Sequence, residues 1–374
     1  MTGTLGVGCL GVTHPHASGR VRKMLATPGV RVAGAADDAG IIEPFTRLLG
    51  IPRKTTDELL ADPGVHAVLI HSRSKDMGPL AMRAMRAGKA VLVEKPGGAT
   101  VADLRELTEV AEATGSVCQV GFTYRFSPAV TAAAGILRSG VLGDVLQVRA
   151  HGGCSLGEAA TSHINLPDDM GGAFWVIGSH IVDLVLSQFG VPASVNGRVA
   201  KLPGGARAAF REDAAVAILN YPDRAASIDF FSWDSMPWVE SWVIEAHGTG
   251  GSLYTRPLPV GYQLYLAEAS GGYPQGWTRW SESSFPEPWA AHTTEYSPEL
   301  AEIANTEFFG IEVDAFLAAV RGEAPVVVTP RDACNTARVI EAVYRSSAEG
   351  GAELKVWAGC LEPDGESPRN KTGP

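Results

Sequence analysis

Short apolar runs alternate with amphipathic stretches over the first 125 residues of the chain. The amphipathic stretches, such as 78–86 and 102–113, repeat apolar positions at helical spacing, whereas the apolar runs have the length of strands. This alternation predicts βαβ units around a parallel sheet. The predicted strands are residues 4–10, 30–36, 65–71, 89–94 and 116–122.

The pattern changes after Pro128. A predicted helix at 129–139 leads to a strand near 145–152 and a long helix at about 172–189. Alternating runs separated by turn residues then predict a mostly antiparallel sheet with helices on one face. These runs are 194–201, 213–221, 225–233, 239–247 and 260–267, followed by a long ordered loop at 268–300 and a helix pair at 306–321 and 331–348.

The chain is therefore expected to be an α/β protein with two domains. We place the first at 1–125 and an α/β domain with a mostly antiparallel open sheet at 126–360. The polar residues 361–374 are predicted to be a disordered tail.

Composition narrows the class of partner. The 374 residues carry 41 acidic and 31 basic side chains, a net charge of −10, which argues against binding nucleic acid or an anionic membrane. Small molecules and other subunits are the expected partners. Because no secretory signal or run of 18 apolar residues occurs, we interpret the protein as cytoplasmic. The five cysteines form no C-x-x-C pair, so neither a metal site nor a disulfide framework is predicted.

Residues 6–11 match the dinucleotide fingerprint Gly-x-Gly-x-x-Gly letter for letter, and we interpret the match as false. A turn at Gly6 would leave too little chain before it for a core strand. We place a strand at 4–10, a phosphate-binding turn at 11–16 and a helix at 17–26. Gly11 is then the one fingerprint glycine retained, and Thr13, His14 and His16 lie where the backbone approaches phosphate; a purely structural role for the two histidines is an equal alternative.

The second predicted strand ends at Asp37, 26 residues after Gly11. An acidic residue near this spacing accepts hydrogen bonds from the adenosine ribose and repels a 2′-phosphate, which favours NAD over NADP as cofactor. The alternative is a solvated acidic turn. Ser72 and Glu94, at the ends of the third and fourth strands, are further candidates for contact with the cofactor.

Lys95 follows the fourth strand in the segment Val-Leu-Val-Glu-Lys-Pro-Gly. In open α/β sheets, ligands bind beyond the carboxyl ends of the strands. Pro96 fixes its own φ, so the lysine can be aimed rigidly across a cleft and is a candidate for contact with the cofactor and for catalysis. The alternative is a surface lysine in a strand-to-helix turn.

Five segments in register resemble the Gfo/Idh/MocA family of NAD(P)-dependent oxidoreductases, and together they extend over nearly the whole chain. They are residues 88–96, 120–128, 178–183, 248–253 and 314–316. The resemblance implies an N-terminal Rossmann NAD-binding domain and a C-terminal domain for substrate binding and oligomerisation, whose open sheet commonly forms dimers or tetramers. It also implies oxidation or reduction of a secondary alcohol on a sugar, cyclitol or related compound.

By this resemblance, Lys95 lies beside nicotinamide and the substrate hydroxyl, His180 is an acid/base and Asp183 binds substrate. Tyr124 and Arg125 are expected to shape the substrate pocket. His180 and Asp183 are three residues apart on an otherwise apolar helix, so they share a face and need a partner or a cavity. A core histidine bonded to a carbonyl is the alternative.

The chain departs from the family pattern at two positions. A catalytic aspartate usually lies four residues before the histidine, where this chain has Val176. Asp168 or Asp169 could replace it from the preceding loop, or the histidine acts without a carboxylate. Met77 replaces the histidine that often follows the third strand.

Six of the eight tryptophans lie between residues 233 and 289. Aromatic faces pack against the C–H faces of sugars, so Trp277 and Trp280 are candidates for a lid or a substrate wall. Positions in a subunit interface or in the core are the alternative.

The leading hypothesis is an NAD-dependent dehydrogenase or reductase acting on a secondary alcohol or ketone of a sugar, cyclitol or glycoside, assembled as a homodimer or homotetramer. A second hypothesis is redox-neutral cleavage or elimination on a glycoside with tightly bound NAD. A third is a non-catalytic NAD-binding sensor or subunit.

Overall fold

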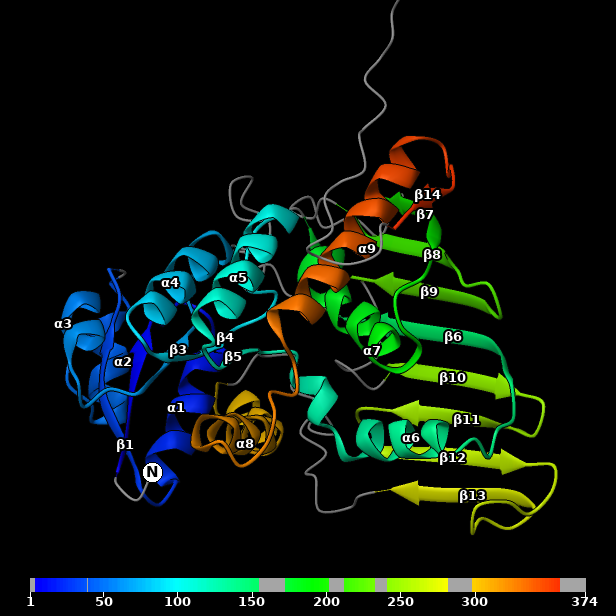
Figure 1. Cartoon of the computed structure of the whole chain (residues 1–374), viewed down its shortest axis with the longest axis horizontal. Coiled ribbons are helices and arrows are strands. Elements are labelled where there is room, and N and C mark those ends of the chain that lie inside the picture. The colour runs from blue at the N-terminus through cyan, green and yellow to red at the C-terminus, as the bar shows by residue number, and fades with distance from the viewer. Residues whose placement is uncertain are drawn as a thin grey trace, which may run out of the picture.

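The computed structural model describes residues 4–38, 40–154, 172–201, 212–232, 241–281 and 298–356. Residues 298–308 are described by their backbone alone. Within these residues the chain forms two sheets that lie side by side (Figure 1), one of five strands and one of nine.

Sheet A is built from the N-terminal part of the chain. Its strands are β1 (Leu5–Leu10), β2 (Val30–Ala36), β3 (Ala67–Ile70), β4 (Ala90–Val93) and β5 (Cys118–Val120), and every pair is parallel in the order β2-β1-β3-β4-β5. The predicted parallel sheet is confirmed, and its central strands are buried because helices cover both faces. These helices are α1 (His16–Ala26), α2 (Ile42–Leu49), α3 (Thr56–Ala61), α4 (Ser74–Arg86) and α5 (Val101–Thr114).

The predicted turn between the first strand and the first helix is confirmed. Gly6 and Gly8 lie inside β1, so the fingerprint match at 6–11 is indeed false. Gly11 has φ +79°, and a Cβ there would lie 2.7 Å from the backbone of Ser72, so only glycine fits. β1 pairs with β2 on one side and β3 on the other, which places a switch-point crevice at this turn.

Sheet B is mostly antiparallel, as predicted, with one parallel pair between β6 and β9. The 3-10 helix η1 (Thr123–Phe126) and helix α6 (Pro128–Arg138) lead into it. The strand order is β13-β12-β11-β10-β6-β9-β8-β7-β14, and α6, α7 and α9 cover one face (Figure 1). The strands are β6 (Val145–Gly153), β7 (Ser194–Ala200), β8 (Ala214–Asn220), β9 (Ala225–Phe231), β10 (Val243–Gly248), β11 (Gly251–Arg256), β12 (Gly261–Leu266), β13 (Gly276–Ser281) and β14 (Leu354–Lys355).

The segment 172–189, which was expected to be one long helix, consists of a π-helical turn and an α-helix. Phe174–Gly178 forms a π-helical turn, and the α-helix α7 (Ser179–Phe189) follows without a break. All five residues of the π turn are buried.

Three elements correct the sequence interpretation. The prediction of one long loop at 268–300 is wrong in two places. Gly276–Ser281 forms the edge strand β13, and α8 (Pro298–Arg321) already begins at Pro298. Strand β11 (Gly251–Arg256) was missed as well. The tail expected at 361–374 and residues 282–297 lie outside the described residues.

Helix α8 packs against α1 of the first sheet, although it follows all but the last strand of sheet B in sequence (Figure 1). Val313, Phe316 and Leu317 are buried in the same apolar cluster as strands β1 and β3. Helix α9 (Pro330–Ala348) returns the chain to sheet B, beside β7.

None of the described helices is long and apolar enough to cross a membrane. Cys9, Cys118 and Cys154 are buried free thiols. Cys334 on α9 is disulfide-bonded, which the spacing of the cysteines did not predict.

Candidate active site

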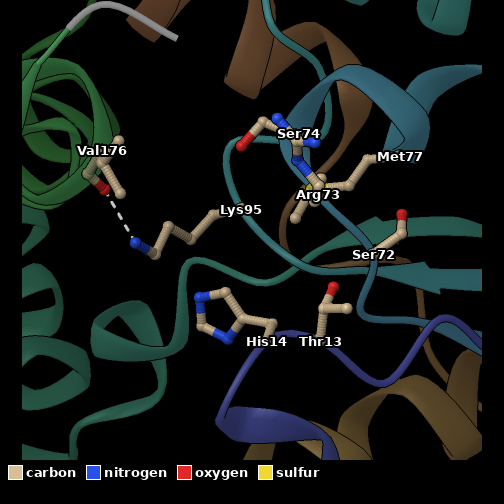
Figure 2. A pocket seen from close by; sticks show the side chains of 8 residues that line it. All are labelled: Thr13, His14, Ser72, Arg73, Ser74, Met77, Lys95 and Val176. Atoms are coloured by element: carbon tan, nitrogen blue, oxygen red, sulfur yellow. Dashed lines mark hydrogen bonds between the residues drawn. The ribbon is translucent and has the colours of Figure 1, made fainter. Parts of the chain in front are cut away.

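A pocket lies at the crevice beyond the carboxyl ends of β1, β3 and β4 (Figure 2). Its lining comes from four places: the turn before α1, the turn before α4, the residue after β4, and the π turn of the C-terminal part. The lining residues are Thr13, His14, Ser72, Arg73, Ser74, Met77, Lys95 and Val176. Three of the predicted cofactor-contacting residues besides Lys95 therefore meet here, together with Val176 and Met77, the two positions that depart from the family pattern.

The wall formed by the two turns suits an anionic group. Thr13 and His14 immediately precede α1, and Ser72 precedes α4, so two helix N-termini face the pocket. The Ser72 hydroxyl is buried and has no hydrogen-bond partner among the described residues. A buried hydroxyl of this kind is satisfied when a ligand or water occupies the pocket.

Asp37 lies beside the same turn. The amide N–H of Val12 donates a hydrogen bond to Asp37 Oδ2 at 2.6 Å, which ties the end of β2 to the turn after β1. The carboxylate is therefore held at the rim of the crevice, where the sequence placed the adenosine ribose.

Glu94 and His16 are not among the lining residues. Glu94 is fully buried beside the pocket, where the Arg20 guanidinium donates to its Oε2, and His16 Nδ1 lies 3.2 Å from the same oxygen. Burial alone would raise the pKa of Glu94, but Arg20 and the imidazoles of His14 and His16 outweigh it and hold that pKa well below its usual range. Arg20 also donates to Glu312 of α8 at 2.7 Å.

The group of His14, His16 and Glu94 has the residue types of a metal site, but its hydrogen bonds disfavour a cation. The amide of His16 donates to Nδ1 of His14, so a proton on this ring is on Nε2, the nitrogen that faces Glu94 at 3.9 Å. A protonated ring nitrogen offers no lone pair to a metal, and Arg20 already neutralises Glu94.

Lys95 is 5% exposed, lines the pocket and is joined to Pro96 by a cis peptide bond. Its Nζ donates a hydrogen bond to the main-chain carbonyl of Val176 at 2.7 Å (Figure 2). Burial lowers the pKa of Lys95 to about 8; Arg20 adds to this effect, whereas Glu94 and Cys154 oppose it. An appreciable neutral fraction near pH 7 makes this amine suitable as a base.

His180 lies one helical turn beyond Val176, so it is close to Lys95. Its ring contacts Tyr124, Phe122 and Trp242, with centroids at 4.5, 5.5 and 6.0 Å. Burial, and then the charge of Lys95, hold the pKa of His180 well below its usual value, so the imidazole is neutral. Its Nδ1 has no partner among the described residues, which does not match a core histidine bonded to a carbonyl.

Asp183 and Arg125 form an ion pair with each other and do not line the pocket. The guanidinium of Arg125 donates to both carboxylate oxygens of Asp183 at 2.7 and 2.6 Å, and neither residue lines the pocket. Burial raises the pKa of Asp183 to about 6, although Arg125 opposes that rise. Tyr124, from the same 3-10 helix, packs on His180.

Trp277 and Trp280 lie on β13, at the edge of sheet B remote from β6, and neither lines the pocket. Trp280 stacks on Tyr262 at 5.5 Å. Trp277 is 47% exposed, on the opposite face of the strand. Asp168 and Asp169, the alternatives to the missing aspartate, lie outside the described residues.

Arg20, Arg73, Ser74 and the Val176 carbonyl were missed by sequence reasoning. Arg20 did leave a signal, since it falls on the buried stripe of α1 formed by Ala17, Val21 and Met24, where an arginine requires partners. The Val176 carbonyl left no signal in the sequence, because a main-chain contact does not depend on the residue type.

The sequence matches two family models. Residues 7–122 match the NAD-binding Rossmann fold of the Gfo/Idh/MocA oxidoreductase family, and residues 135–356 match its C-terminal alpha/beta domain. The chain belongs to the Gfo/Idh/MocA oxidoreductase family. The predicted family and fold class are thereby confirmed, and the protein is an oxidoreductase.

Individual relatives are distant from this Gfo/Idh/MocA protein. The oxidoreductase YdgJ of Escherichia coli is 27% identical over 256 residues, 67% of this chain and 71% of YdgJ. The scyllo-inositol 2-dehydrogenase (NAD⁺) of Bacillus subtilis is 33% identical over 142 residues, 37% of this chain and 40% of that enzyme. Among solved structures, a levoglucosan dehydrogenase in complex with NADH and levoglucosan has a TM-score of 0.74 at 19% identity, covering 94% and 99% of the two chains; this likeness shows the fold alone.

Proposed function

We propose that this Gfo/Idh/MocA oxidoreductase transfers a hydride between NAD and a secondary alcohol or ketone of a sugar-like or cyclitol-like molecule. The observation that carries the proposal is the approach of Lys95 to the helix bearing His180, at a pocket between the two parts of the chain. The relative named for scyllo-inositol dehydrogenation supports the substrate class.

The residues around the crevice fit a dinucleotide. Gly11 permits close approach of a backbone, and the N-termini of α1 and α4 with Thr13 and Ser72 would hold the pyrophosphate. Asp37 would accept hydrogen bonds from the adenosine ribose, which favours NAD over NADP. When bound, the nicotinamide supplies the hydride acceptor or donor.

Lys95 and His180 would handle the proton. Oxidation of a carbinol requires loss of the hydroxyl proton as the hydride leaves the carbon, and a neutral Lys95 would accept that proton on Nζ. His180, held neutral among aromatic rings, would bind the substrate hydroxyl and orient it toward Lys95. In reduction, the Lys95 ammonium returns the proton to the carbonyl oxygen.

A substrate panel tests this function. NADH formation is measured at 340 nm with sugars, cyclitols and glycosides, and Lys95→Met should lower kcat by about 10²- to 10⁴-fold on a true substrate. Lys355→Met on the exposed strand β14 is the control and should keep the wild-type rate. Wild-type turnover by Lys95→Met would refute the assignment of Lys95. NAD retained through purification, with activity that needs no added cofactor, would instead indicate redox-neutral chemistry.

A further inference from the structure

The partner of Lys95 is a main-chain atom. Among the described residues, the hydrogen bond from Nζ goes to the Val176 carbonyl at 2.7 Å, and no carboxylate oxygen lies within salt-bridge distance of the ammonium. The Val176 side chain lines the same pocket and is 7% exposed. An apolar side chain and a neutral carbonyl therefore face the amine.

The Val176 carbonyl belongs to the π turn. A π turn holds one more residue than an α turn, so its junction with the following α-helix shifts carbonyls away from their regular amide partners; such turns are frequent at functional sites. The Val176 carbonyl accepts from two side chains, Lys95 Nζ and the hydroxyl of Ser179 at 3.1 Å. The π turn is fully buried, and this fixes the direction of the carbonyl.

We propose that the main-chain carbonyl of Val176 is the positioning group for Lys95, and that it aims the amine into the pocket without holding it as a permanent ammonium. A neutral amine has two N–H bonds and one lone pair, so it can donate to the carbonyl and still accept a proton from a hydroxyl. This inference relies on the proposed function only in taking Lys95 as the base.

A carboxylate at the same place would have a different effect. An opposite charge within hydrogen-bond distance stabilises an ammonium and raises its pKa, commonly by about one to three units. The other groups that face Lys95 are Glu94, already paired with Arg20, together with His16, His180 and Cys154. Arg20, whose charge also acts on Lys95, stays charged near neutral pH, so Val176 is the position at which a new charge would act most directly.

The test follows the titration of Lys95 without any substrate. The full chain has eight lysines, so ¹³Cε-lysine labelling gives few NMR signals, and Lys95→Arg identifies the signal of Lys95. Wild-type Lys95 should titrate near pH 8. Val176→Asp should raise this pKa by about one unit or more, whereas Val176→Asn, matched in shape but uncharged, should leave it within about half a unit of wild type.

The outcomes separate this inference from the proposed function. A wild-type Lys95 that titrates near 10, or a Val176→Asp protein that folds and titrates like Val176→Asn, overturns the role of the carbonyl whatever the substrate panel shows. If the Val176→Asp protein does not fold, the pKa of Lys95 in the wild type decides whether the inference stands. A panel without turnover refutes the proposed function and leaves the titration result in place.

Discussion

Asp37 is the side chain on which the proposed preference for NAD over NADP rests. Its carboxylate accepts from the Val12 amide and is thereby fixed at the rim of the crevice. A fixed negative charge at this place would repel the 2′-phosphate of NADP, whereas the neighbouring Asp38 is exposed to solvent and its charge is screened.

We therefore expect Asp37→Ser to weaken discrimination between the two cofactors. The ratio of the NADPH to NADH dissociation constants, measured by fluorescence titration, should fall by about tenfold or more, because the repulsion and the ribose hydrogen bonds are lost together. Asp38→Ser is the matched control and should leave that ratio unchanged. An equal effect of both substitutions would mean that only net charge at the rim matters.

Residue-level reasoning from sequence succeeded where the backbone demands a particular residue type. Gly11 has a positive φ and no room for a Cβ, so the turn was predictable. Lys95 and His180 were predictable as candidate site residues, because each is a polar side chain in an apolar stretch of sequence. The mutual pairing of Arg125 and Asp183 was not, because each has a plausible role in a pocket and the choice depends on three-dimensional geometry.

At the level of elements, the strand β13 and the start of α8 were the main errors. β13 is an edge strand whose residues alternate between half-buried and exposed, within a stretch rich in Gly and Pro, so its pattern is weak. The helix α8 begins eight residues before the predicted start. Element type was predictable in the parallel sheet because its strands are continuous apolar runs.

The contribution of the α1–α8 contact to stability can be tested by substitution. Arg20 is fully buried and serves both Glu94 and Glu312, whereas Lys23, one turn further on, pairs with Asp314 at the surface. Arg20→Met should lower the free energy of unfolding by about 3–5 kcal/mol, because two buried carboxylates lose their cation. Lys23→Met on the same helix should cost less than about 1 kcal/mol. Urea denaturation measures the free energy of unfolding of both variants. Equal losses would contradict a stabilising role for the buried ion pairs of Arg20 with Glu94 and Glu312.

For the whole molecule, the face of sheet B that no described helix covers is the feature that bears on assembly. Helices cover one face, and the alternation along the strands leaves Val216, Ile218, Tyr265 and Trp277 on the other, each 39–54% exposed. Exposed apolar side chains spread over one sheet face are typical of an interface. We propose that this face forms the contact in a homodimer or homotetramer.

Ile218→Asp should therefore reduce the mass of the particle in solution. Light scattering after size exclusion should give a multiple of the chain mass for the wild type and a smaller multiple for the variant, because a buried charge without a partner opposes association. Leu48→Asp on α2, another exposed apolar position at 64%, is the control and should not change the mass. A wild-type monomer would rule the interface out.

The return of α8 to the first sheet affects how the protein is made. Val313, Phe316 and Leu317 complete an apolar cluster that begins at Leu5, and Glu312 supplies the second partner of Arg20. During synthesis from the N-terminus, about 190 further residues follow β5 before α8 can close the core of the first sheet and Glu312 can pair with Arg20. The strands of the first sheet are therefore synthesised well before the helix that completes their apolar core.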